Sequence, residues 1–172
     1  NSTDFGDLAA ANTGLEGACD LTRGIWGGGQ TPSTVNTIQH VTFASAGNTT
    51  DFGDLTVGRQ RLGGLSNAHG GLTDFFPRKP ELYSPTGKVV NQPGDIAIFG
   101  GGDAPSDSKD VEFIQITSAG NGTNFGDLIQ DIDDSNAVGN SSKCLFAGGD
   151  AGTTYQDQIQ VIQVSTKGVE FL

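Results

Sequence analysis

The sequence contains no methionine and only two histidines, two cysteines and one tryptophan among its 172 residues. His40 and His69, with two tyrosines and two cysteines, are too few for a copper centre of the Tyr/His/Cys kind. No G-x-S-x-G, H-E-x-x-H or phosphate-binding glycine loop occurs, because the glycine triplets end strands rather than open helices. We therefore expect no catalytic residue, no enzymatic activity and no resident cofactor.

Long apolar runs and positive charge are also scarce. No run of 18 apolar residues occurs, which predicts that the chain has no transmembrane span. Nine basic residues against 20 acidic ones give a formal net charge of −11. A nucleic-acid backbone requires clustered Lys and Arg, so nucleic acid is excluded as a partner. The absence of methionine even at position 1 indicates a chain processed or cut from a longer one, and no signal peptide is visible.

The chain is instead rich in glycine, with 27 residues, and in repetition. A T-[DN]-F-G-D-L phrase occurs at residues 3–8, 50–55 and 123–128. Apolar residues followed by glycines alternate with this phrase at residues 25–29, 98–102 and 145–149. Phe5 and Phe52 are 47 residues apart, and so are Phe99 and Phe146. A period of this length predicts stacked supersecondary units within one repeat domain.

The repeat divides residues 1–172 into units at about 3–49, 50–122 and 123–172. The middle unit has about 26 extra residues near 73–98, which include four prolines. Prolines interrupt central strands and favour turns, so this insert is either a surface excursion or a degenerate fourth unit.

Each unit is expected to consist of short strands joined by polar turns, without helices. One strand per unit has apolar residues on both faces, so we expect it to be bulged or covered on both sides. Trp26, Phe99 and Phe146 occupy the same position, or phase, of the repeat, which predicts that they are buried at equivalent sites. His40 has the phase of Phe113 and Val161, which predicts a packed strand residue rather than a ligand.

Each unit follows one order: an apolar strand that ends in a Gly pair, a variable loop, a second apolar strand, and a turn that leads to an aromatic residue. Residues 96–101, 111–114 and Phe125 follow this order. The order resembles the kelch-type repeat. The resemblance implies an all-β, β-propeller-like stack of three to four kelch-like antiparallel blades, fewer than kelch propellers usually have. The T-D-F-G-D-L wording resembles repeats in structural and tail-fibre proteins of tailed, especially marine, phages. It implies a virion or extracellular location.

The resulting hypothesis is a non-enzymatic virion structural or adhesion module, a tail fibre or decoration protein whose loops bind a surface or a host glycan. The alternatives are a secreted carbohydrate-active propeller enzyme and a self-assembling extracellular filament subunit. Because the chain begins and ends at nearly the same repeat phase, we expect its terminal strands to pair with another virion or filament subunit, as in a homo-oligomer.

The candidate binding residues lie in the variable loops and the insert: Gln30, Thr31, Arg78, Tyr83, Asp103, Asp107 and Asp110. The recurrent Asp and Asn of the turns are expected to cap their own backbone. A Ca²⁺ site at Asp131, Asp133 and Asp134 remains the alternative, since calcium takes several carboxylate oxygens. Cys19 and Cys144 are either free or bridged; the sequence leaves both open.

Overall fold

The computed structural model describes residues 2–67, 95–103, 105–140 and 143–164. Within these ranges the protein has eleven strands and no helix, which confirms the predicted all-β class. The strands form three antiparallel sheets in which neighbours along the chain are neighbours in the sheet. The part of the chain that the structure describes thus has no helix able to span a membrane.

The three sheets follow one another along the chain. Sheet 1 contains β1 (Glu16–Cys19), β2 (Arg23–Gly27), β3 (Thr37–Thr42) and β4 (Thr50–Asp54). Sheet 2 contains β5 (Gly63–Ser66), β6 (Ile96–Gly100), β7 (Asp110–Gln115) and β8 (Thr123–Asp127). Sheet 3 contains β9 (Asn136–Gly139), β10 (Lys143–Ala147) and β11 (Ile159–Gln163). The extra residues of the middle unit fall between β5 and β6, so the question of a fourth unit lies outside the described residues.

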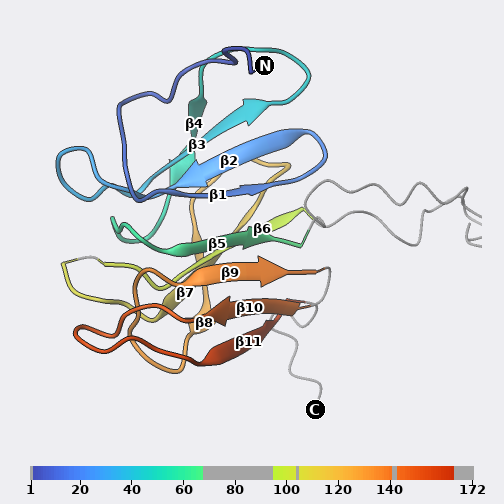
Figure 1. The fold of residues 1–172 in the computed structure, drawn as a ribbon. Coiled ribbons are helices and arrows are strands. Elements are labelled where there is room, and N and C mark those ends of the chain that lie inside the picture. Colours follow the sequence, from blue (N-terminus) through green and yellow to red (C-terminus); the bar gives the residue numbers. More distant parts are fainter. Residues whose placement is uncertain (1, 68–94, 104, 141–142, 165–172) are drawn as a thin grey trace, which may run out of the picture.

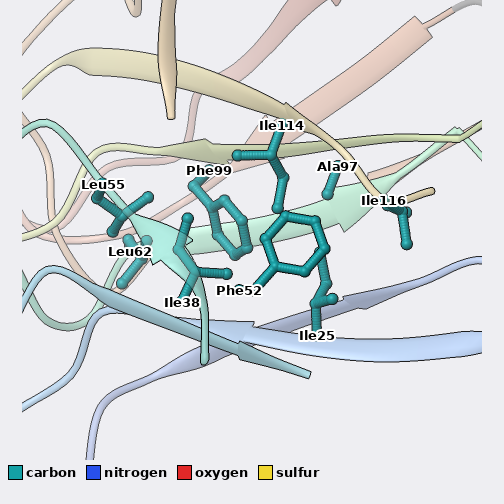
Figure 2. Close-up of a cluster of buried hydrophobic side chains, with 9 residues drawn as sticks. All are labelled: Ile25, Ile38, Phe52, Leu55, Leu62, Ala97, Phe99, Ile114 and Ile116. Carbon is teal, nitrogen blue, oxygen red and sulfur yellow. The ribbon is translucent and has the colours of Figure 1, made fainter. Parts of the chain in front are cut away.

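The sheets stack face to face, sheet 2 between the other two (Figure 1). One apolar cluster fills the space between sheets 1 and 2, and the ring of Phe99 lies among Ile38, Phe52 and Ile114 (Figure 2). A second cluster, which contains Phe146, fills the space between sheets 2 and 3. Each of the two sheet–sheet interfaces therefore has its own core.

The aromatic residue of each lower sheet packs on glycines of the sheet above it. A Cβ atom at Gly27 would lie 3.2 Å from the Phe99 ring, and one at Gly100 would lie 2.9 Å from the Phe146 ring. Phe99 is 0% exposed and Phe146 1%, as predicted. The same prediction was wrong for Trp26, which is only half-buried, because within the described residues no sheet stands above sheet 1 to cover it.

The third strand of sheet 2, β7, is covered on both faces, because Val111 lies in the core shared with sheet 3 and Ile114 in the core shared with sheet 1. The bulges lie not in the third strands but in the fourth strands, β4 and β8, that pair with them. The pairing of β3 with β4 shifts between Ile38 and Gln39, which leaves Phe52 as the extra residue of the bulge. Gly53, the next residue, has φ 153°, a value that L side chains rarely adopt, and Gly126 of β8 has φ 149°. The bulge directs Phe52 into the core, where it is 3% exposed. This geometry explains why Gly follows Phe in every copy of the phrase.

The second and third copies of the phrase, which open units 2 and 3, are the last strands of the sheets that precede them. The residues 50–54 form β4 of sheet 1 and the residues 123–127 form β8 of sheet 2. The backbone of β4 also contacts the turn of the following sheet, where the Gly120 N–H donates to the Phe52 carbonyl at 2.9 Å. The first phrase makes the same bond to sheet 1, from Gly47 N–H to the Phe5 carbonyl at 2.7 Å.

Candidate functional site

Three loops at one edge of the stack join the second and third strands of the sheets. They comprise residues 28–36, 101–109 and 148–158, and we call them the loop edge (Figure 1, left). Each begins with two glycines at positive φ, such as Gly28 at 69° and Gly29 at 101°. The corresponding angles in the second loop are also 69° and 101°, and those in the third are 65° and 103°. The backbone therefore leaves each sheet in the same direction, although the loop sequences differ.

Isolated β-bridges hold each loop closed and tie it to the stack. Within the loops, these bridges pair Gln30 with Thr34, Asp103 with Asp107, and Asp150 with Tyr155. The first residue of each pair also bridges the segment that enters the same sheet, as in Gln60 with Asp103 and Asp133 with Asp150. The backbone hydrogen bonds of the loops are thus satisfied by neighbouring segments, which favours a fixed shape.

A backbone ladder runs along the stack beside these loops. The Arg61 N–H donates to the Gly14 carbonyl at 2.8 Å, and the Asp134 N–H donates to the Arg61 carbonyl at 2.9 Å. The three residues have the same repeat phase and the same left-handed backbone, with φ of 66°, 55° and 48°. Because only Gly adopts this conformation without cost, Arg61 and Asp134 show that the stack imposes it.

Carboxylates gather where the loops of sheets 2 and 3 meet. Asp133 is buried, and its pKa is raised, first by burial and then by the negative charge of Asp134, with a smaller contribution from Asp107. Arg61 opposes this shift through an ion pair with Asp133 at 3.4 Å. Asp103 accepts a hydrogen bond from the Gln60 amide at 3.3 Å. The loop edge is therefore strongly acidic at this point.

Replacement of Asp133 by Asn should change the pH dependence of stability. The folded protein holds the Asp133 proton more tightly than the unfolded chain, whose pKa is near 3.8. The stabilisation linked to this proton is present below the unfolded pKa and is lost as the pH rises through the folded pKa. The stability of D133N relative to the wild type should therefore increase across that window in urea unfolding. A pH-independent difference would contradict the prediction.

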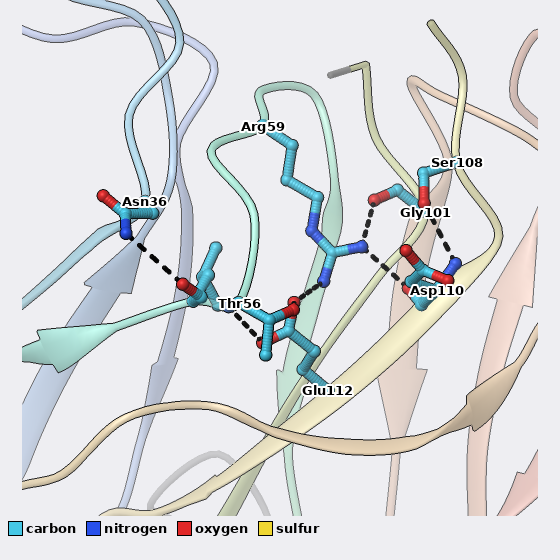
Figure 3. A network of polar contacts seen from close by, with 8 residues as sticks. Asn36, Thr56, Arg59, Gly101, Ser108, Asp110 and Glu112 are labelled. Carbon is cyan, nitrogen blue, oxygen red and sulfur yellow. Dashed lines mark hydrogen bonds and ion pairs between the residues drawn. The ribbon is translucent and has the colours of Figure 1, made fainter. Parts of the chain in front are cut away.

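A buried ion pair lies behind the loop edge (Figure 3). Arg59 and Glu112 are each 1% exposed and contact one another through Nη2 and Oε1. Arg59 also donates to the carbonyl oxygens of Asp110 at 2.9 Å and Gly101 at 3.2 Å, while Glu112 accepts from the Thr56 N–H at 2.8 Å. This network fixes the second loop to the segment that follows β4.

Only some of the predicted binding residues meet at the loop edge. Gln30, Thr31, Asp103 and Asp107 lie in its loops. Asp110 begins β7, and its carbonyl serves the Arg59 network rather than a free surface. Arg78 and Tyr83 lie outside the described residues.

The third loop adds two residues that the sequence pattern did not indicate. Asp150 has the repeat phase of Gln30 and Asp103, and Tyr155 is 88% exposed, the most exposed large apolar side chain described. An alignment of the three glycine pairs would have found Asp150, whereas the exposure of Tyr155 depends on the longer third loop.

The candidate calcium residues do not converge. Asp131 and Asp134 are exposed, whereas Asp133 is buried and paired with Arg61. Across residues 2–67, 95–103, 105–140 and 143–164, no group of three or more His, Cys, Asp or Glu side chains is placed to hold a metal ion. Both cysteines are free, and burial raises the pKa of the Cys144 thiol to about 12.

The protein is therefore an all-β stack of antiparallel sheets that presents three loops, each closed by a β-bridge, at one edge. No family model matches the sequence, and no curated protein matches it.

Proposed function

We propose that the chain is a propeller-like, kelch-type module without enzymatic activity, a structural and adhesion part of a virion or another extracellular assembly, and that the loop edge is its contact surface. The observation that carries this proposal is the loop geometry. Loops of unlike sequence leave the three sheets with the same backbone angles and are closed by the same kind of bridge. A scaffold that fixes the backbone and varies the side chains is suited to recognition.

The chemistry of the loop edge favours a polyhydroxylated ligand, that is, a glycan. Carboxylates such as Asp107 accept hydrogen bonds from hydroxyl groups. The exposed ring of Tyr155 offers an apolar face and a polar hydroxyl on which a sugar ring can stack. Because stacked sheets repeat about every 10 Å, neighbouring loops contact successive segments of an extended polymer.

The test is binding of the chain to a panel of neutral and basic polysaccharides by calorimetry or on an array. The double variant Y155A/D107N should weaken binding at least tenfold, because it removes the exposed ring and one carboxylate. Asp51, exposed on β4 and outside the loop edge, provides the matched control, and D51N should bind as the wild type does. Absence of binding to every polysaccharide, or equal binding by Y155A/D107N, would contradict the proposal.

One observation favours a carbohydrate-active enzyme as the second candidate. Asp133 has a raised pKa close to the charges of Asp134 and Asp107, and a carboxylic acid beside a carboxylate is the pair used in glycoside hydrolysis. Cleavage of a bound polysaccharide that is lost in D133N, with folding intact, would support the enzyme. Binding without cleavage supports the adhesion module.

A further inference from the structure

The outer face of sheet 3 has the apolar pattern of an interface but is uncovered within the described residues. Val138 and Ile159 are 63% and 70% exposed. The residues with the same register in sheet 2, Leu65 and Val111, are 6% and 0% exposed because sheet 3 covers them. The face of sheet 3 is thus built like a face that another sheet covers.

Sheet 3 also has only three described strands, where sheets 1 and 2 have four. In the complete sheets the fourth strand is the phrase, and its Gly pairs with a buried residue of the third strand: Gly53 with Ile38, and Gly126 with Val111. Ile159 is the residue of β11 with this register. The free edge of β11 can therefore pair with one more copy of the phrase.

An unused copy of the phrase lies at the other end of the stack. Residues 3–8 lie beyond sheet 1 and are bound to its 44–48 turn as β4 is bound to the next sheet. Gly6 has φ 153°, the same value as Gly53, so the first phrase already has the bulged form. It pairs with no third strand in the described structure.

The side chains at the two ends are complementary. The Phe of β4, Phe52, packs edge-on against His40 of β3 with ring centroids 5.5 Å apart. Phe125 packs in the same way against Phe113 at 6.0 Å. The corresponding residues of the incomplete pair are Phe5, bound to the turn of sheet 1, and Val161 of β11 in sheet 3, and they are 42% and 58% exposed.

We propose that a second copy of this chain docks head to tail on sheet 3. Its residues 3–8 pair with β11 as the fourth strand, with Gly6 opposite Ile159 and Phe5 against Val161. Its Trp26, half-buried in the single chain, covers sheet 3 as Phe99 and Phe146 cover the sheets above them. The interface thus continues the two sheet–sheet interfaces already present in the chain.

A second copy fits better than the chain's own residues 165–172. In all three phrases the Phe is followed by a Gly with φ between 149° and 153°. Phe171 is followed by Leu172, whose side chain disfavours this conformation. The docking is heterologous, so repeated association gives a ring or a filament. The inference rests on the proposed propeller-like stacking and names the partner of the assembly.

Sedimentation of complementary variants tests the proposal. The wild type should associate with increasing concentration, whereas V161D and F5D should each sediment as monomers of 17.7 kDa. Because each variant keeps one intact end, their mixture should form a dimer and nothing larger. V57D, with an equally exposed apolar residue elsewhere, is the control and should assemble as the wild type does. Circular dichroism confirms that the variants fold.

Three results would overturn the proposal: a wild type that is monomeric at every concentration, single variants that still associate, or a mixture that stays monomeric. The first would assign the edge of β11 to residues 165–172 or to a further unit of a longer chain. The V161D variant has an unchanged loop edge but should be monomeric. Measuring its glycan binding therefore tests the proposed function separately from the proposed docking of a second copy.

The register gives a second readout. Thr50 and Thr123, the equivalents of Thr3, are the partners of His40 and Phe113. Partners in an antiparallel pair have Cα atoms about 4.5–5.5 Å apart, a separation that a disulfide can span. A T3C chain mixed with a V161C chain should therefore form a disulfide-linked dimer, and T3C mixed with Q163C should not. Equal cross-linking of both mixtures would overturn the assigned register.

Discussion

Replacing Glu112 by Gln should lower the free energy of unfolding by about 3–5 kcal/mol, because it leaves the guanidinium of Arg59 buried without its counter-ion. The change is nearly isosteric, so packing is preserved. Arg59 would keep its bonds to the carbonyls of Gly101 and Asp110, but these are neutral acceptors. Burial already lowers the pKa of Arg59, and the charge of Glu112 opposes that shift.

The other repeat units indicate which second substitution should restore the stability lost in E112Q. Gln39 and Gln160 have the phase of Glu112 and accept the same backbone hydrogen bond, from Ala9 and Ile129 at 2.9 and 2.7 Å. Unit 3 combines this Gln with Ile132 at the phase of Arg59. The double variant R59I/E112Q should therefore recover most of the stability lost in E112Q. Urea unfolding at pH 7 measures both; a loss below about 1 kcal/mol in E112Q, or no recovery in the double variant, would contradict the account.

Replacing Phe99 by Ala should cost about 3–5 kcal/mol, the usual range for a fully buried aromatic side chain. Phe99 is 0% exposed and its ring packs against Gly27 of sheet 1, where the missing Cβ leaves room for it. The substitution opens a cavity between sheets 1 and 2 that Ile25 and Ile38 cannot fill from their strands.

Trp26 provides the control, because it has the same repeat phase but is only half-buried. W26A should cost clearly less than F99A when both are measured in dilute solution, where the chain is a monomer. Equal losses would mean that the two aromatic residues have equivalent surroundings, against the end position of sheet 1.

The repeat in the sequence predicts the all-β stack and the burial of Phe99 and Phe146, because residues of equal phase receive equal surroundings inside a stack. It does not predict the exposure of Trp26, since the sequence does not show which unit lies at an end. The pairing of Arg59 with Glu112 was also missed. The ion pair joins residues 53 positions apart in the sequence. In the other two units a Gln at the position of Glu112 accepts the backbone hydrogen bond without an Arg partner.

The loop edge was predicted in part. Gln30, Asp103 and Asp107 were found because polar residues follow a glycine triplet, and such a turn places them outside the sheet. The proximity of Asp107 to Asp133 was not predicted, because these residues belong to different sheets and come close only when the sheets stack.

The central claim is that the segment after each phrase is hydrogen-bonded to the next sheet of the stack. Hydrogen exchange at the Thr56 and Ile129 amides tests this claim. Both residues have exposed side chains, yet their N–H groups donate to Glu112 and Gln160 of the next sheet. We predict strong protection at both amides in the wild type. In Q160A, Ile129 should lose its protection while Thr56 keeps it. Rapid exchange at both amides in the wild type would contradict the stacked arrangement.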